Sequence, residues 1–88
     1  MNAEDEKEAY NAAFMEATQA LRERAGFTQE EIATVLRMQQ DKYKQYESRT
    51  PLPHYLVTAF CLACRVEPSR LYNDADKALA KRRRTSAA

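Results

Sequence analysis

Apolar side chains recur at helical spacing along most of the chain. The first series follows intervals of four, three and four residues and consists of Tyr10, Phe14, Ala17 and Leu21. This spacing places the four side chains on one face of a helix, and no glycine or proline interrupts residues 4–25. We therefore predict one long amphipathic helix over about residues 4–25. Gly26 is expected to end it, because glycine readily adopts the left-handed backbone conformation.

A second helix is predicted to begin at Thr28. Thr28 and Glu31 have the spacing of a capping box, in which each side chain accepts a hydrogen bond from the backbone amide of the other residue. Phe27 and Ile32 occupy the two positions of a hydrophobic staple. The apolar face of this helix is formed by Ile32, Ala33, Val35 and Leu36.

The third predicted helix begins near Gln40, after a break at residues 37–39. Tyr43 and Tyr46 are expected to pack in the core with their hydroxyls at the surface, because tyrosines at helical spacing are more often packing residues than base-stacking ones. The other positions are polar, and their side chains have a size suited to base edges and phosphates. They are Gln40, Asp41, Lys42, Lys44 and Gln45.

Two further helices complete the predicted fold. Proline residues mark a turn over residues 48–53, and Pro53 is expected to open a helix that runs to about Cys64. Its predicted buried stripe is Leu56, Ala59, Phe60 and Ala63. Pro68 suits the first position of a fifth helix. Asn73 and Asp74 could end that helix and cap a short additional one over residues 75–83, which contains Leu79.

Composition supports an all-α fold and a non-catalytic role. The chain has 88 residues, with 44% hydrophobic and 31% charged residues, one glycine, three prolines and no tryptophan. So few glycines and prolines do not suit a β structure rich in turns. We expect one domain over residues 1–80, too small for a deep enclosed active site, followed by a basic flexible tail over residues 81–88. No enzymatic activity and no cofactor are expected.

The two cysteines have the CxxC spacing, at Cys61 and Cys64. A redox motif of this kind would follow a strand, and none is predicted here. A zinc site would need two further ligands, which His54, the only histidine, does not supply. We therefore interpret both cysteines as small buried residues in a reducing compartment, and expect no metal.

The net charge of +1 conceals an uneven distribution. Residues 1–8 carry a net charge of −3 and residues 77–88 carry +5, which leaves −1 for residues 9–76. This balance disfavours a purely electrostatic nucleic-acid binder, whereas a sequence-specific one stays open. The acidic cluster fits either a solvated helix end or a contact with a partner subunit. The basic tail fits a solvated segment, a nonspecific phosphate contact or, in another kind of cell, a nuclear signal.

The chain lacks the features of exported or membrane proteins. No basic N-terminal region leads into an apolar run, and no apolar stretch approaches eighteen residues. We therefore expect a cytoplasmic protein.

Several of these positions together closely resemble the Cro and lambda-repressor-like helix-turn-helix family, of the xenobiotic-response-element type. The resemblance covers about residues 14–72, and residues 26–33 are its most specific part. The positions that carry it are Leu21, Arg22, the run from Gly26 to Ala33, Leu36, Tyr43, Tyr46, Glu47, Pro53, Leu56 and Leu71. The flanking helices fall at the expected places, which strengthens the pattern.

The resemblance implies a compact five-helix domain and a sequence-specific transcriptional regulator, expected to be a repressor. Such a protein binds an inverted-repeat operator as a homodimer, with its recognition helix in the major groove of double-stranded DNA. The alternative is a protein-binding module, such as an antitoxin or an anti-activator, that acts mainly through a protein partner. Asp41 on the recognition helix and the nearly neutral body of the domain motivate this alternative.

Individual residues take roles from the resemblance. Arg22 and Glu47 match a structural ion pair between the first helix and the recognition helix. The candidates for base contacts are Gln40, Asp41, Lys44 and Gln45. The candidates for phosphate contacts are Gln29 and Lys42, which match family positions, and Arg37 and Arg49, which lie close to the motif in sequence. For Arg49 a merely solvated loop is an equally good interpretation. The dimer candidates are Leu71 and Tyr72 by resemblance, and Leu79 as the large apolar residue of the last segment.

Two departures from the family pattern concern the turn. Arg37 stands where a glycine is usual, so the turn is either slightly altered or built with Arg37 in an ordinary helical geometry. Gln39 stands where Ser or Thr usually caps the recognition helix, and glutamine is a poor cap. Both departures bear on the tilt of the recognition helix.

Overall fold

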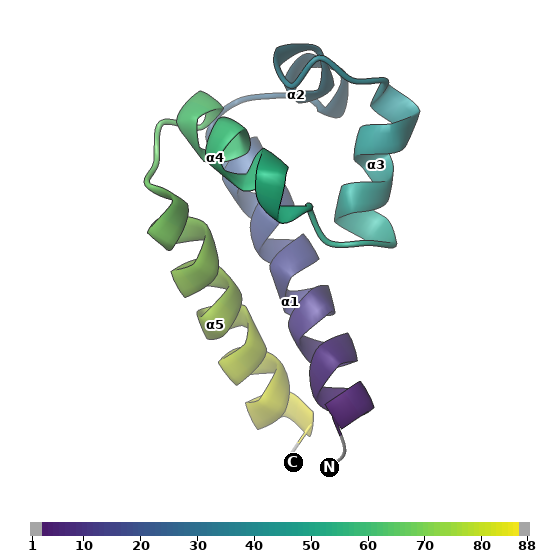
Figure 1. Cartoon of the computed structure of the whole chain (residues 1–88). Helices are drawn as coiled ribbons and strands as arrows, with labels where there is room; N and C mark the ends of the chain where they lie inside the picture. Colours follow the sequence, from purple (N-terminus) through teal and green to yellow (C-terminus); the bar gives the residue numbers. More distant parts are fainter. Residues whose placement is uncertain (1–2, 87–88) are drawn as a thin grey trace.

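The described part of the chain folds into five helices. A computed structural model describes residues 3–86, and no strand occurs among them. The helices are α1 (Ala3–Arg24), α2 (Gln29–Val35), α3 (Gln40–Ser48), α4 (His54–Ala63) and α5 (Pro68–Ser86) (Figure 1). The predicted all-α helix-turn-helix architecture, with its long first helix, is confirmed.

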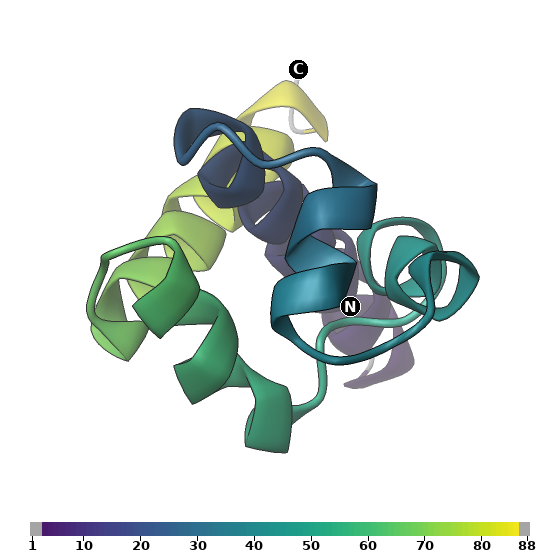
Figure 2. The same ribbon diagram turned by 90° about the horizontal axis from the view of Figure 1, so that it is seen from above.

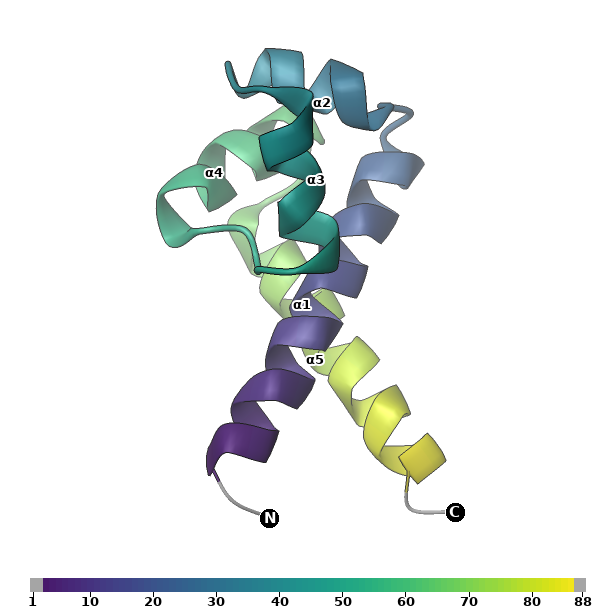
Figure 3. The same ribbon diagram turned by 90° about the vertical axis from the view of Figure 1, so that its right-hand side faces the viewer.

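The two long helices form one half of the molecule and the three short ones the other. α1 and α5 run antiparallel, make the most extensive helix pair and bring both ends of the chain to the same side (Figure 1). Their free ends diverge when seen from the side (Figure 3). Large buried side chains from all five helices meet where the halves join; examples are Phe14, Ile32, Tyr43, Phe60 and Leu71. The shared core fixes α2 and α3 relative to α1.

The helix starts agree closely with the sequence patterns. The Thr28 hydroxyl accepts from the Glu31 amide at 3.0 Å, and the Glu31 carboxylate accepts from the Thr28 amide at 2.8 Å, so the predicted capping box is present. α3 starts at Gln40, as expected. Its N-cap Gln39 makes no side-chain hydrogen bond to the helix, in keeping with its poor capping character.

Three helices end in the same way, with a left-handed residue just after the last turn. That residue is Gly26 after α1, Arg37 after α2 and Arg65 after α4, with φ values of 87°, 58° and 60°. After α2 the amide of Met38 donates to the Ala33 carbonyl and the amide of Arg37 to the Thr34 carbonyl, both at 3.0 Å. This pair of bonds is the Schellman motif, and the ends of α1 and α4 carry the same pair. The ordinary helical geometry considered for Arg37 is therefore wrong.

The buried face of α4 differs from the predicted one. Val57, Phe60, Cys61 and the C-cap Cys64 face the core, whereas Ala59 is exposed and Leu56 and Ala63 are half-buried. Apolar residues surround this helix on nearly every side, so the sequence period could not select the face that packs. The neighbouring helices select it.

The fifth helix is continuous, which corrects the prediction of a short additional helix. Asn73 and Asp74 do not interrupt it; the Asp74 carboxylate accepts from Nε of Arg70 at 3.0 and 3.2 Å, one turn earlier. Packing against α1 stabilises a helix that local sequence preferences leave marginal. Residues 81–86, predicted as tail, also belong to α5, and the last two residues of that predicted tail lie outside the described part.

The acidic and basic ends of the chain meet within the molecule. Arg82 forms an ion pair with Glu16 at 3.2 Å, and Arg83 forms another with Glu6. The acidic start of α1 therefore faces the basic end of α5. None of the interpretations given above for the two charged ends included this pairing. These pairs are exposed, so each contributes little to stability. Within residues 3–86 no helix is both long and apolar enough to cross a bilayer.

Candidate nucleic-acid interface

The predicted ion pair between Arg22 of α1 and Glu47 of α3 is present and buried. Nε and Nη2 of Arg22 donate to the two carboxylate oxygens of Glu47 at 2.7 and 3.1 Å. The third nitrogen, Nη1, donates to the Phe27 carbonyl in the α1–α2 connection at 2.7 Å. Only 9% of the Arg22 side chain and 3% of the Glu47 side chain are exposed. One guanidinium thus joins α1, the connection and α3.

Two further side chains complete the hydrogen bonding of Glu47. Gln29 of α2 donates from Nε2 at 3.0 Å, and the Tyr43 hydroxyl donates to the other carboxylate oxygen. Burial by itself would raise the pKa of Glu47, but the hydrogen bonds from Arg22, Tyr43 and Gln29 outweigh it and hold the pKa below its ordinary value. Glu47 is therefore ionised, and its hydrogen bonds link α1 and α2 to α3.

This network corrects the prediction for the Tyr43 hydroxyl. Tyr43 is fully buried, and its hydroxyl lies against Glu47 instead of reaching the surface. Burial, followed by the hydrogen bond to the Glu47 carboxylate, raises the pKa of Tyr43 well above its usual range. The neighbouring Tyr46 ring is also buried and meets Tyr43 edge-on at 6.4 Å between centroids. Both tyrosines are packing residues, as predicted.

The opposite face of α3 is polar and open to solvent. Gln40 is half-buried, and the other four members of the face, Asp41, Lys42, Lys44 and Gln45, are exposed. No ion pair links Asp41 to Lys44 or to another of the described residues. Five of the eight predicted contact residues therefore lie on one helix, whose inner face is held by the Glu47 network.

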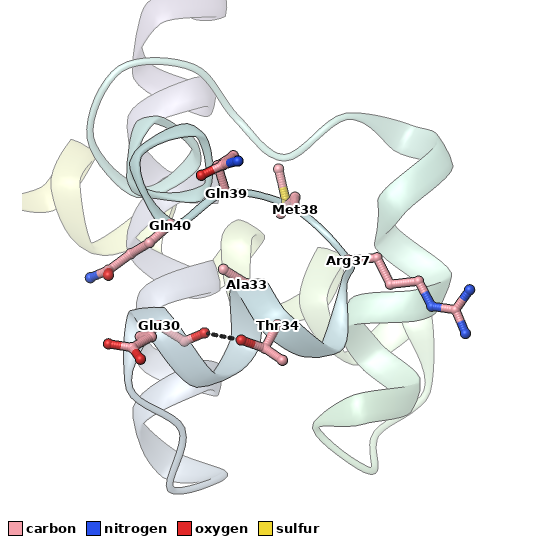
Figure 4. Close-up of a pocket in the computed structure, with 7 residues that line it drawn as sticks. All are labelled: Glu30, Ala33, Thr34, Arg37, Met38, Gln39 and Gln40. Carbon is pink, nitrogen blue, oxygen red and sulfur yellow. Dashed lines mark hydrogen bonds between the residues drawn. The ribbon is translucent and has the colours of Figure 1, made fainter.

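A shallow depression lies between α2, the turn and the start of α3. Figure 4 shows its lining residues, with Glu30 and Gln40 on one side and Arg37 extending away on the other. The depression has a volume of about 470 Å³ and is lined by Glu30, Ala33, Thr34, Arg37, Met38, Gln39 and Gln40. The Thr34 hydroxyl donates to the Glu30 carbonyl at 3.0 Å, so it is engaged within α2. The open, polar lining suits contact with a solvated surface better than enclosure of a small molecule.

The predicted phosphate contacts divide into two groups. Arg37, Lys42 and Arg49 are exposed, in the turn, on α3 and directly after α3. Gln29 is half-buried, and its amide nitrogen is engaged by Glu47. The three cationic residues surround the recognition helix as a phosphate-binding set would, whereas Gln29 helps to position that helix.

The predicted dimer residues differ in accessibility. Leu71 is fully buried in the core of its own subunit, so its assignment to a dimer contact is wrong in this structure. Tyr72 is 42% exposed and packs on Phe14 with 5.6 Å between ring centroids, and Leu79 is half-buried on α5. Of the three predicted dimer residues, Tyr72 and Leu79 are the two with accessible surface.

The cysteines lie in the core, as predicted. Both are buried and unbonded to each other. Burial raises the pKa of Cys61, and burial together with the neighbouring Cys61 raises the pKa of Cys64 to about 11. Both thiols are therefore protonated near neutral pH. Among residues 3–86 no group of three or more His, Cys, Asp or Glu side chains is placed to hold a metal ion.

Sequence reasoning missed one feature of this site and one feature outside it. The bond from Tyr43 to Glu47 had a local signal, because residues four apart face each other on a helix. The convergence of Arg24, Arg65 and Arg70 beside the α4–α5 turn had none, since these residues come from three separate elements. Sequence spacing carries no information on such a meeting.

Two short helices joined by a tight turn, the second with a free polar face, define a helix-turn-helix protein. A family model described as a helix-turn-helix domain matches residues 19–71, from the second half of α1 to the first turn of α5. The chain belongs to this family, which indicates a DNA-binding regulator. No curated protein and no solved structure matches the chain significantly.

Proposed function

We propose that this protein is a sequence-specific transcriptional regulator of the Cro and lambda-repressor-like kind, acting as a repressor and without catalytic activity. The observation that carries the proposal is the polar outer face of α3, on a helix whose inner face is anchored by the buried bond between Arg22 and Glu47. Sequence recognition needs contact groups on a rigid element that fits the major groove, and α3 meets both requirements.

Four side chains of α3 are proposed to contact bases. Gln40 and Gln45 have amide groups that can pair with adenine, and Lys44 can donate to guanine. Asp41 accepts from the amino group of cytosine, because a carboxylate beside a phosphate would be repelled. These contacts would select the operator sequence.

Three cationic side chains are proposed to contact phosphates. Arg37, Lys42 and Arg49 are exposed at the start, on the side and just beyond the end of α3. Contacts of this kind fix the position of the protein on the duplex without selecting bases. The Gln29 side chain is proposed to act indirectly, through its bond to Glu47, although its free carbonyl leaves a water-mediated phosphate contact open.

A single recognition helix contacts only a few base pairs, so useful specificity requires two. We propose a homodimer on an inverted repeat, with half-sites about 34–36 Å apart. Tyr72 and Leu79 on α5 provide the apolar surface for this contact in the proposal, and Leu71 no longer does.

Selection of fragmented host DNA on the purified protein tests the proposal directly. Fragments retained at moderate salt would be sequenced, and enrichment of an inverted repeat is the expected result. Retention of fragments without any shared sequence, by protein that circular dichroism shows to be folded, would contradict sequence-specific recognition.

Single substitutions separate base contacts from phosphate contacts on the selected operator. Gln45→Ala should relax the base preference at one position in each half-site, by about 1–3 kcal/mol of discrimination. Lys42→Ala, the matched control on the same helix, should weaken binding to all sequences evenly and reduce the salt slope by about 0.9 per half-site. A change in base preference with Lys42→Ala alone would reverse the two assignments.

A second candidate function is binding to a protein partner, as in an antitoxin or an anti-activator. The observation that favours it is the exposed, unpaired carboxylate of Asp41 on the face of α3. Co-purification from the host would recover such a partner. An affinity for that partner unaffected by Lys44→Glu, with no operator enriched, would favour this candidate over the DNA regulator.

A further inference from the structure

Three arginines converge beside the α4–α5 turn, outside the proposed DNA interface. Arg24 lies in the last turn of α1, Arg65 is the left-handed residue after α4, and Arg70 lies in the first turn of α5. All three line one cavity of about 270 Å³. Residues 9–76 carry a net charge of only −1, so this is a local concentration of positive charge in a nearly neutral body.

The other side chains that line the cavity are small or apolar. Besides the arginines it is lined by Leu21, Ala25, Cys64 and Val66. A neighbouring cavity of about 400 Å³ shares Ala25, Cys64 and Arg65 with it and extends the apolar lining to Phe27 and Ala63. No carboxylate lines either cavity. Because the pKa of the Cys64 thiol is raised to about 11, the thiol is neutral and adds no negative charge.

The guanidinium groups retain free donors. Asp74 engages Arg70 through Nε, and no hydrogen bond or ion pair to another described residue uses the Nη atoms of Arg70. Arg24 and Arg65 form no ion pair within the described part of the chain. Guanidinium groups bind carboxylate and phosphate oxygens through paired N–H donors, so the rim is suited to an anion.

The cavity lies beside the α4–α5 turn, and no residue of α3 lines it. The α4–α5 turn and α3 lie on opposite sides of the molecule in both Figure 1 and Figure 2. A duplex bound along α3 would therefore not cover the three arginines. Operator binding therefore does not account for their positive charge, and a different ligand has to be considered.

We propose that this cavity binds a small organic anion, with a carboxylate or phosphate held by the arginines and an apolar group against the lining. A volume of about 270 Å³ lies just below the usual lower limit of roughly 300 Å³ for ligand pockets, which restricts the apolar part to about one ring. The adjoining cavity leaves room for a second substituent. This site is independent of the proposed operator contacts.

Calorimetric titration of the full chain with phenyl phosphate tests the proposal. Saturable binding with one site per chain is expected, and benzoate should compete for it if the arginines recognise either anion. Benzyl alcohol keeps the ring without the charge, and inorganic phosphate keeps the charge without the ring, so both should bind at least about tenfold more weakly. Equal affinity for phenyl phosphate and benzyl alcohol, or no saturable binding of phenyl phosphate, would overturn the proposal.

Two substitutions to glycine provide a matched pair. Arg65→Gly removes one guanidinium at a left-handed position that glycine tolerates, so the fold is retained. It should weaken phenyl phosphate binding at least about tenfold while operator binding stays unchanged. Arg37→Gly makes the same change at the other left-handed arginine and should leave phenyl phosphate binding unchanged.

A second variant tests whether a loss of binding in Arg65→Gly comes only from a local change of the backbone. Arg24→Gln on α1 keeps a helix-compatible side chain and should also weaken phenyl phosphate binding. If neither Arg65→Gly nor Arg24→Gln weakens it, or if Arg37→Gly weakens it equally, the ligand binds elsewhere and the assignment of this cavity is wrong. If the wild-type protein enriches no operator, the proposed function is contradicted, whereas the outcome of these titrations is unaffected.

Discussion

The α2–α3 turn and the α4–α5 turn share one backbone motif but present different surroundings. In each, an arginine takes the left-handed position and two backbone bonds close the preceding helix. In each, the following apolar residue, Met38 or Val66, packs against the core. Arg37 then lies beside the polar recognition helix, whereas Arg65 lies with two other arginines over an apolar lining.

A helix-ending motif therefore places a side chain without determining its use. Arginine at φ near 60° costs about 1 kcal/mol relative to glycine, and the chain bears this cost at both turns. The only glycine, Gly26, ends α1, where no comparable cationic role arises. An arginine at an unfavourable backbone position indicates a use for its charge.

The largest effect should come from breaking the buried ion pair between Arg22 and Glu47, on the α2–α3 side. Glu47→Ala leaves the buried Arg22 unpaired and should lower the free energy of unfolding by about 3–5 kcal/mol. The control on the α4–α5 side is Asp74→Ala, which breaks a partly exposed pair and should cost less than about 1 kcal/mol. Urea unfolding of both variants measures the difference. Equal losses would mean that the Glu47 network does not anchor α3.

Lowering the pH should weaken the same side of the molecule, because it protonates Glu47. The pKa of Glu47 is lowered in the folded state, so its stabilising contribution is present above the unfolded pKa of about 4.3 and is lost as pH falls through the folded value. Thermal melts between neutral and acidic pH should show this loss for the wild-type protein. Glu47→Gln has no carboxylate to titrate, so its melting temperature should depend less on pH. Parallel profiles would contradict the assignment.

Removing the side chain at either left-handed position should stabilise the fold. Arg37→Gly and Arg65→Gly should each raise the free energy of unfolding by about 1 kcal/mol, a rise in Tm of about 4–8 °C. Arg37→Ala and Arg65→Ala are the controls, because alanine keeps the Cβ atom that disfavours this conformation, and they should not stabilise. Differential scanning calorimetry distinguishes the outcomes. Stabilisation by alanine would point to relief of charge repulsion instead of backbone strain.

The smallest effect concerns the cap of the recognition helix. Gln39→Ser adds a side-chain acceptor for the first turn of α3 and should stabilise the protein by about 0.5–1 kcal/mol. Gln39→Ala is the control, since alanine cannot cap. Chemical unfolding measures both variants. A loss of operator affinity in the serine variant would show that the uncapped start of α3 is needed for DNA contact.

Local patterns were sufficient where neighbours in sequence are neighbours in space. The spacing of Thr28 and Glu31 predicts the start of α2, and the polar run from Gln40 to Gln45 predicts the exposed face of α3. Both depend on interactions within one or two helical turns. The pairing of Arg22 with Glu47 lies beyond that range, and it came from the resemblance to a known family.

Local patterns failed where packing between distant segments decides. Asn73 and Asp74 are suited to ending a helix, but α1 lies alongside and α5 continues through them. Ala59 belongs to an almost wholly apolar helix, so its exposure depends on which face the neighbours cover. The family resemblance failed for the same reason at Leu71, which it places in a dimer contact and which instead fills the core of its own subunit.

The sequence by itself determined where α2 and α3 begin, the break between them and the polar face of the recognition helix, because short-range spacing encodes each of them. Only the tertiary structure decided that Gln29 joins Glu47, that the charged ends of α1 and α5 pair, and that three arginines share a cavity. Those contacts join residues from separate elements, and the elements meet only when the common core forms.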